Sequence, residues 1–594
     1  MKRNEKRYDV IVVGSGGGGL RAAISAASFG ASVLVLGKGK SNRSGATLLA
    51  GANISADIAC DGESLYKLGI SDKNKDDTRE KWFSDLITEG FHLNNQKLVQ
   101  LFVDTAGERV REMLSWGMKV RGMEGPREIS VSGADILDVL YKKAHSLGVD
   151  FKSDIQFSDI AIEHGETCGV VCLNLLEGEL MYYPSSSVIL ATGGAHNLFP
   201  YNSGSTDLCG EGQAAALRAG AELVDMEMVS FCPTVITKPE MYQGNILPYI
   251  LFSYGYGNLY NKFGKTFTGK YLSLQVERLA METEWNKMLL SYAIQKEINA
   301  GGSNCHGGIY YSLDLYPKEI LEELYLELPP LKKGIYANIM EGFESGHAVT
   351  VIPSAHYFEG GIKINERMET KVPGLYAAGE CTGGMFGANR VSAATTEMLV
   401  EGALAGENAA LFAKKRNGQI DVCSKALTEM EEDLCRPFHH TGRSDVRHAM
   451  SSVRSCVGDS MSVLRSQNKL DIALCKIEQI AKKELPDISF SNKTPIYNRE
   501  WMDYLSLRNM TVTAQAMIRS ASLRRESRGV HVREDCDFTD NRNFLGNFII
   551  EDSKFNYRFE KPISQDSSMP APICRSYVTY VEQVVAELER EEDK

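Results

Sequence analysis

The sequence has no excess of basic residues. Its 594 residues include 65 Lys and Arg against 77 Asp and Glu, which gives a formal charge of −12. An acidic chain without a long basic run is a poor binder of nucleic acid. We therefore expect no nucleic-acid partner.

Long apolar runs are also missing. No stretch of about 18 or more uninterrupted apolar residues occurs, so no membrane span is expected. Residues 1–7 are charged and lack the apolar core of a signal peptide. We expect a cytoplasmic protein, which a partner could still hold at a membrane surface.

Closely spaced cysteine pairs are the third absence. The 13 cysteines are scattered, no CxxC pair occurs, and Cys168 and Cys172 are the nearest pair of note. Metal and iron–sulfur sites usually need such spacings. We expect no metal in this chain, and reduced, mostly buried thiols.

The length and composition are those of a large globular protein. An apolar share of 43% and a charged share of 24% are ordinary for such a chain. A chain of 594 residues exceeds one compact domain. Two to four domains are therefore expected.

A dinucleotide-binding pattern opens the chain. The β-branched run Tyr8–Val13 predicts a buried parallel strand, and the glycine-rich segment 14–19 follows it. An Ala-rich helix is predicted over 20–29 and a second strand over 32–36. Strand, glycine turn, helix and strand within about 30 residues is the context that gives the G-x-G-x-x-G motif its meaning.

Three glycines of this loop have separate physical roles. Gly14 allows the tight turn, Gly16 lets the backbone approach a pyrophosphate, and Gly19 lets the helix pack closely on the strand. The acidic residue that usually ends the second strand and binds ribose is replaced by Gly37 and Lys38. This favours FAD over NAD; either the ribose contact comes from elsewhere or Lys38 serves the phosphates.

Two later segments look like further strands of the same sheet. The run 187–191 leads into Thr192 and Gly193, and the run 374–379 leads into Glu380. Short strands that end in glycine and then a carboxylate suit a cofactor lying across several strand ends. Glu380 is the candidate for the missing hydroxyl contact, with a surface carboxylate as the alternative.

These and further motifs resemble one family, the succinate dehydrogenase and fumarate reductase flavoprotein subunits, whose superfamily includes L-aspartate oxidase and the adenylylsulfate reductase flavoprotein. The similarity runs from Tyr8 to about Asp535. Besides the segments above it includes Arg43-Ser44-Gly45-Ala46-Thr47, Gly210-Glu211-Gly212, His356-Tyr357-Phe358-Glu359-Gly360-Gly361, Gly387-Ala388-Asn389-Arg390 and the specific segment 525–535.

The resemblance implies an α/β fold with three parts. A Rossmann-like FAD-binding domain would be split into 1–232 and 346–418, and an α+β capping domain would be inserted at 233–345. A C-terminal helical domain would cover 419–550, followed by a tail over 551–594 that ends in solvated acidic residues. The recurrence of Leu507, Met510, Ala514, Met517, Ile518 and Ala521 at helical spacing independently predicts a packed helix.

The resemblance also carries over a set of FAD contacts. They come from the glycine loop, the segment after the second strand, two further strand ends and the start of a late helix. The residues are Gly14, Ser15, Gly16, Gly17, Gly18, Gly19, Lys38, Ser44, Gly45, Ala46, Thr47, Thr192, Gly193, Glu211, Glu380, Arg390, Thr395 and Thr396. Family members with covalent flavin have a His where Gly45 stands, so FAD is expected to be noncovalent.

The substrate side keeps only part of the family pattern. His356 and Arg390 remain, one family His reads as Cys232, and the shuttle Arg falls in 289–294, where Tyr292 replaces it. The family's cap motif is not recognisable near 252–255. Losing a positioned acid costs about 10²–10⁴ in rate, so efficient turnover of fumarate or succinate is not expected.

The candidate catalytic residues are Tyr292, Arg390 and His356, and each has a structural alternative. Tyr292 is either an acid or a filler of the lost Arg's space. Arg390 either binds an anionic group of the substrate or pairs with a buried carboxylate such as Glu397. His356 is either catalytic or part of a turn, and Cys232 is interpreted as a small passive side chain.

Two functions follow from this pattern. The first is an FAD-dependent oxidoreductase that acts on a small anionic substrate other than fumarate or succinate and exchanges electrons through an iron–sulfur partner. The second is an electron-transfer subunit that relays electrons within a larger redox complex and has a vestigial substrate pocket. An oxidase resembling L-aspartate oxidase is a weaker third, because that enzyme also uses the shuttle Arg.

Overall fold

The computed structural model describes residues 1–56, 78–124, 127–238, 240–247, 258–277, 285–312, 349–390, 393–416, 422–565 and 569–592. At its centre lies a mixed sheet whose parallel part is built from β-branched and leucine-rich runs. In it β2 (Tyr8–Val13) lies between β3 (Val33–Leu36) and β10 (Glu179–Leu190). The strands β7 (Asp150–Lys152) and β17 (Leu375–Ala377) extend the parallel part on the two sides.

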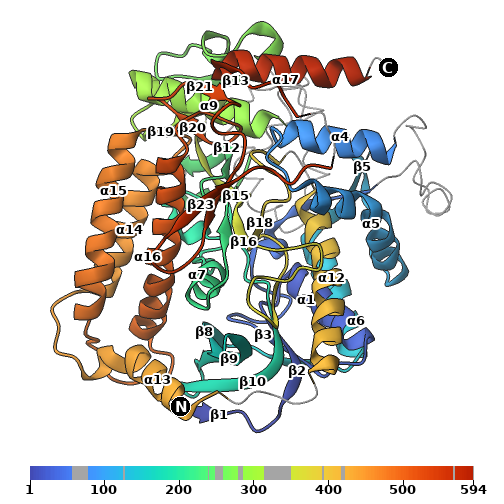
Figure 1. Cartoon of the computed structure of the whole chain (residues 1–594). Coiled ribbons are helices and arrows are strands. Elements are labelled where there is room, and N and C mark those ends of the chain that lie inside the picture. The colour runs from blue at the N-terminus through green and yellow to red at the C-terminus, as the bar shows by residue number, and fades with distance from the viewer. Residues whose placement is uncertain are drawn as a thin grey trace.

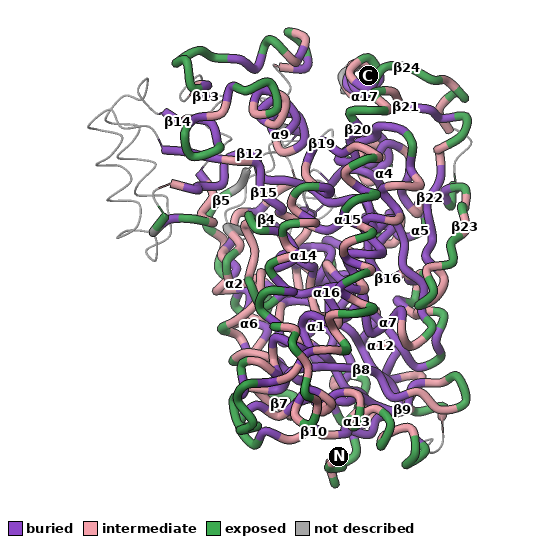
Figure 2. The backbone as a smooth tube through the Cα atoms, turned by 90° about the vertical axis from the view of Figure 1, so that its left-hand side faces the viewer, coloured by how far each residue is buried: buried purple, intermediate pink, exposed green. Residues whose placement is uncertain are grey.

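Two helices cover this sheet side by side (Figure 1). They are α1 (Gly17–Ser28) and α12 (Ala394–Lys415), which pack directly on each other. Their close approach depends on Gly402 and Gly406, where a Cβ atom would lie 2.7 Å from the Gly18 oxygen and 2.1 Å from the Ala22 oxygen. Figure 2 shows that both helices are largely buried.

The predicted elements of the dinucleotide fold are present with small shifts. The strand over Tyr8–Val13 is confirmed to the residue, and α1 begins three residues before the predicted helix, inside the glycine loop. The strand predicted at 187–191 is the end of a longer one, because β10 continues outward to pair with an antiparallel hairpin. That hairpin is formed by β8 (Ile155–Glu163) and β9 (Glu166–Asn174).

A second sheet stands over the carboxyl ends of the parallel strands. It is antiparallel, in the order β12 (Val229–Lys238), β15 (Val349–Phe358), β14 (Ile309–Ser312) and β13 (Asn258–Tyr260). The helix α9 (Asn286–Glu297) packs on β12 and β15, and its apolar side joins a second hydrophobic core.

A helical region lies on the side of the molecule away from α1 and α12, and its buried side chains belong to the same hydrophobic core as the central sheet (Figure 1). It contains α13 (Ser424–His439), α14 (Val446–Ser460), α15 (Gln467–Gln479) and α16 (Arg499–Leu523), the last three packed on one another. All six residues of the predicted apolar stripe lie buried on α16, as expected for a core helix.

The C-terminal segment contains more structure than a tail. Its helix α17 (Tyr577–Glu592) packs on the second core through Tyr577, Tyr580 and Val581, and Leu588 near its acidic end is still partly buried there. A third sheet joins β11 (Leu223–Val224), β16 (Gly361–Lys363), β18 (Thr382–Gly383), β22 (Asn547–Ile550) and β23 (Tyr557–Glu560).

The remaining elements are short strands and covering helices. They are β1 (Lys2–Arg3), α2 (Ala46–Leu49), β4 (Gly51–Ser55), α4 (Arg79–Glu89), α5 (Gln96–Ser115), β5 (Gly122–Glu124), β6 (Glu128–Ser132), α6 (Gly133–Ser146), α7 (Glu211–Arg218), β19 (Leu464–Arg465), β20 (Val532–Arg533), β21 (Phe538–Asp540) and β24 (Cys574–Ser576). Across the described ranges, no helix is both long and apolar enough to cross a membrane. The domain boundaries given above stay predictions.

Candidate active site

The glycine loop lies at the carboxyl end of β2. A Cβ atom on Gly14 would lie 2.1 Å from the Ala191 oxygen, and one on Gly19 would lie 2.0 Å from the Gly14 oxygen. Both positions therefore need glycine for strand and helix to meet. At Gly16 the nearest atom would be the Thr47 hydroxyl at 3.7 Å, so the loop is open there.

The start of α1 has no side-chain cap. Its N-cap residue is Gly16, and the Gly17 N–H donates to the Thr47 hydroxyl at 3.2 Å. Gly45, two residues before Thr47, has φ +83°, and a Cβ atom there would meet nothing within 4 Å. An uncapped helix start beside open glycines can bind phosphate through its amides.

Lys38 is engaged by a predicted site residue. Its amine donates to the Glu211 carboxylate at 2.9 Å and to the Asp207 carbonyl at 3.0 Å. The second Glu211 oxygen accepts from the Cys209 N–H at 2.9 Å. Burial would lower the pKa of Lys38, but the charges of Glu211, Cys209 and Asp207 raise it overall. Lys38 and Glu211 thus form one ion pair.

Unsatisfied polar atoms gather at the ends of β10 and β17. The Thr192 hydroxyl and one Glu380 oxygen, Oε1, are buried without a hydrogen-bond partner among the described residues. The other Glu380 oxygen accepts from the Gly194 N–H at 3.1 Å. Buried polar groups are normally bonded, so these two point to a polar ligand.

The first turn of α12 contacts the same region. The Thr396 hydroxyl accepts from the Ser55 N–H at 2.7 Å and donates to the Ser55 carbonyl at 2.9 Å. Thr395 beside it is buried, and the N-cap residue Ala393 has φ +79° and no side-chain cap. The first amides of α12 therefore have no side-chain cap.

Together these features fit FAD. The glycine loop and the uncapped start of α1 match the needs of a pyrophosphate. The unpaired Thr192 hydroxyl and Glu380 carboxylate match the needs of a polyol chain carrying hydroxyls.

His196 joins the cofactor side to the substrate side. Its Nε2 lies 2.9 Å from the His356 carbonyl oxygen and 3.5 Å from Glu380 Oε1. Only a protonated nitrogen can donate to a carbonyl, so Nε2 carries the hydrogen. His196 therefore lies between the Glu380 carboxylate and the backbone carbonyl of His356; its Nε2 hydrogen goes to the carbonyl, so Glu380 Oε1 keeps no hydrogen-bond partner in the described part of the chain.

The His356 ring is positioned by a serine. Its Nδ1 lies 2.8 Å from the Ser203 hydroxyl, and the side chain is half-buried on β15. Burial lowers the pKa of His356 well below its usual value, and the positive charges of Lys287 and Arg390 lower it further. His356 is therefore neutral at pH 7. Its ring can donate or accept a hydrogen bond but carries no charge.

Arg390 is held by protein groups. Its Nη1 donates to Glu397 at 3.2 Å, and its Nε lies 3.9 Å from Glu359. The guanidinium carbon lies 3.1 Å from the centre of the Tyr357 ring, and the Tyr357 hydroxyl bonds the same Glu397 carboxylate. The pairing with Glu397 considered from the sequence is thus present.

Tyr292 lies in the second core. It is buried on α9, with its ring centre 5.7 Å from that of Tyr577 on α17 and the Lys296 amine 5.4 Å away. Burial raises the pKa of Tyr292. No described interaction joins it to His356 or Arg390, so its role as an acid stays a prediction.

Lys287 is a site residue that the sequence reasoning missed. It lies in the first turn of α9, one turn before Ser291, whose hydroxyl donates to the Phe231 carbonyl at 3.1 Å. Residues four apart share a helix face, and Phe231 pairs across the sheet with Ala355, the neighbour of His356. The side chain of Lys287 is half-buried there. The signal in the sequence that could have identified it is a basic side chain five residues before Tyr292.

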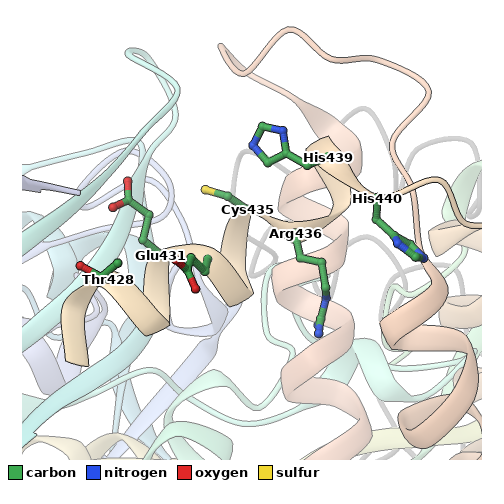
Figure 3. Close-up of a pocket in the computed structure, with 7 residues that line it drawn as sticks. Thr428, Glu431, Cys435, Arg436, His439 and His440 are labelled. Atoms are coloured by element: carbon green, nitrogen blue, oxygen red, sulfur yellow. The ribbon is translucent and has the colours of Figure 1, made fainter. Parts of the chain in front are cut away.

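Cys232 and a surface hollow on α13 lie outside the set of candidate catalytic residues. Cys232 is fully buried in the ladder opposite Ser354, which agrees with a passive role, and the segment 252–255 lies outside the described residues. A surface hollow of about 650 Å³ lies on α13, lined by Thr428, Glu431, Glu432, Cys435, Arg436, His439 and His440 (Figure 3). None of the predicted site residues lines it.

The fold and this site define an FAD-dependent oxidoreductase. Two family models match, one described as "FAD binding domain" over residues 9–396 and one as "Fumarate reductase flavoprotein C-term" over residues 450–577. The chain belongs to the fumarate reductase and succinate dehydrogenase flavoprotein family, as its motifs suggested.

Relatives match over nearly their whole length. One subunit of the fumarate reductase (CoM/CoB) of Methanothermobacter marburgensis is 29% identical over 89% of this chain and 94% of its own. An uncharacterised FAD-dependent oxidoreductase of Methanocaldococcus jannaschii is 30% identical over 92% and 97%. The quinol fumarate reductase flavoprotein of Escherichia coli superposes with a TM-score of 0.83 at 25% identity, covering 96% and 99%.

Proposed function

We propose that this protein reduces or oxidises a small anionic substrate other than fumarate or succinate. The observation that supports the proposal is the position of His196, whose Nε2 lies 3.5 Å from Glu380 Oε1 and 2.9 Å from the backbone carbonyl of His356, between a predicted cofactor residue and a predicted substrate residue. Bound FAD supplies two-electron hydride chemistry. It would be held noncovalently, since Gly45 has no side chain that could bond it.

The protein's own residues would act around the reacting carbon. Neutral His356, oriented by Ser203, would donate a hydrogen bond from its ring N–H to a carbonyl or carboxylate oxygen of the substrate. Lys287 on the adjoining helix face would supply the proton, since a lysine amine is protonated at neutral pH. Arg390 would orient the substrate while remaining bonded to Glu397.

An electron partner is part of this proposal. Several relatives are named as subunits, among them those of the CoM/CoB fumarate reductase and of the 8-methylmenaquinol:fumarate reductase of Wolinella succinogenes. We propose an iron–sulfur protein as the partner, because these relatives are subunits of larger redox enzymes and this chain belongs to their family. The site would then exchange electrons with a cluster outside the chain.

One observation favours an alternative. Arg390 is already paired with Glu397 and covered by the Tyr357 ring, as expected if the substrate pocket were vestigial. The protein would then relay electrons without substrate chemistry of its own. In that case Arg390→Ala would leave electron transfer to the partner unchanged.

The test is anaerobic oxidation of reduced viologen by the FAD-loaded protein. The panel would contain unsaturated mono- and dicarboxylic acids and thioester-like acceptors. We expect turnover with at least one acceptor, and loss of that turnover in His356→Ala. No turnover with any acceptor, with FAD bound, would rule out the enzyme and leave the relay.

A further inference from the structure

Glu359 is a buried carboxyl group without a hydrogen-bond partner. It follows the last residue of β15, and its backbone N–H donates to the Met228 carbonyl at 3.0 Å, which fixes its position. The side chain is fully buried, and neither carboxylate oxygen has a hydrogen-bond partner among the described residues. Burying an unbonded carboxylate is costly, so such a residue is expected to have a function.

The charged group nearest to Glu359 is Arg390, at 3.9 Å. Arg390 is bonded on its other side to Glu397 at 3.2 Å and covered by the Tyr357 ring. Glu380 also acts on Arg390 electrostatically. Three carboxyl groups thus surround one guanidinium, and a further dicarboxylate would have to compete with them.

We propose that Glu359 is a specificity-determining residue that restricts the substrate site to acceptors carrying at most one negative charge. The inference rests on the proposed function and narrows its substrate class. A dianion would meet Glu359 and Glu397 as like charges, whereas a monoanion needs only one favourable contact. The restriction comes from electrostatics and not from the size of the site.

The proposal implies a dependence on pH. Burial raises the pKa of Glu359 to about 7, with Glu397 and Glu380 adding to the rise and Arg390 opposing it. The nearby Ser230 hydroxyl, on the neighbouring strand β12, also lowers it, although that hydroxyl donates its hydrogen bond to the Tyr357 carbonyl at 3.3 Å. Below this pKa Glu359 is neutral and competes less for Arg390, so dianions should bind more tightly in acid.

The experiment titrates the FAD-loaded protein with fumarate, a dianion, and crotonate, a monoanion of the same carbon skeleton length. Perturbation of the flavin absorbance reports binding without turnover. We expect Glu359→Gln to bind fumarate about tenfold more tightly at about pH 8, with crotonate changed less than about twofold. The matched control Glu222→Gln removes a carboxylate that is bonded instead to Arg558 and Lys371, and should change neither.

The wild-type protein provides a second measurement, which does not depend on the folding of the variant. Its affinity for fumarate should increase as the pH is lowered from about 8 to about 6, while the affinity of Glu359→Gln stays constant. Equal fumarate binding by both proteins, or a wild type that prefers fumarate at every pH, would overturn the proposal. Failure of turnover alone would refute only the proposed function, because the titration measures binding.

Discussion

At the residue scale, Lys287 and Tyr292 are two candidates for one role. Tyr292 was the sequence-based choice, but it packs on Tyr577 within the second core, and burial makes its hydroxyl a weaker acid. Lys287 lies on the helix face toward the β12 and β15 pair, close enough for its charge to lower the pKa of His356. Position therefore favours the lysine.

The prediction is that Lys287→Met lowers the rate constant of turnover by about 10²–10⁴ while FAD stays bound, because a positioned acid is lost. The matched control is Lys262→Met, at an exposed lysine whose amine lies 5.1 Å from the Phe263 ring. Stopped-flow reoxidation of the reduced flavin by the best acceptor measures the step. If Tyr292→Phe abolished the rate and Lys287→Met did not, the sequence-based choice would be correct.

At the element scale, the turn between β2 and α1 combines two requirements in one loop. Gly19 serves the packing of the helix on the strand, since its Cβ would lie 2.0 Å from a backbone oxygen. Gly16 serves the opening of the loop, since its Cβ would meet only the Thr47 hydroxyl at 3.7 Å. Gly16 has φ −76°, a value that alanine adopts without strain.

The same substitution, glycine to alanine, is therefore expected to affect FAD binding at Gly16 and protein stability at Gly19. Gly16→Ala should keep the fold of the FAD-free protein but weaken FAD binding about tenfold, because the methyl group occupies the approach of the pyrophosphate. Gly19→Ala should lower stability by about 1–3 kcal/mol or more through overpacking. Fluorescence quenching of added FAD and thermal melting of the FAD-free proteins measure the two effects. Unchanged FAD affinity in Gly16→Ala would contradict the assignment of this loop to the pyrophosphate.

At the scale of the whole molecule, a buried acid links distant segments. Asp225, between β11 and β12, has φ +52°, and its carboxylate accepts from the Asn547 amide at 2.7 Å. Burial and then the charge of Glu227 raise the pKa of Asp225 to about 8. In the folded protein it therefore keeps its proton at pH values where the unfolded chain has released it.

A stability dependence on pH follows from this shift. Because the folded state binds the extra proton between about pH 4 and about pH 8, its stabilisation is present below the unfolded pKa and is lost as pH rises through about 8. Asp225→Asn should remove this part of the dependence, and asparagine tolerates the positive φ and can still accept from Asn547. The melting temperatures of the two proteins, at fixed FAD concentration, should converge or cross between about pH 5 and about pH 8.

The control for that measurement is Asp104→Asn on the exposed side of α5, which should follow the wild type at every pH. A wild-type and Asp225→Asn pair whose melting curves shift in parallel with pH would show that Asp225 does not titrate in this range.

The local pattern of residues was sufficient for the elements. The apolar run before the glycine loop, the glycine spacing and the stripe along α16 determined the strand, the turn and the helix, because each depends on neighbours in the chain. The family motifs likewise determined FAD as the cofactor. Periodicity and loop chemistry are properties that a linear sequence displays directly.

The substrate side was decided only by the tertiary structure. Three features depend on β12, β15, α9 and α12 meeting in space: the pairing of Arg390, the burial of Glu359 beside it, and the effect of the Lys287 charge on His356. A side chain's charge and accessibility are set by neighbours that are far apart in sequence, and a motif does not contain them. The sequence by itself therefore determined the cofactor and the fold, while the charges and contacts of the proposed substrate residues arise from long-range packing.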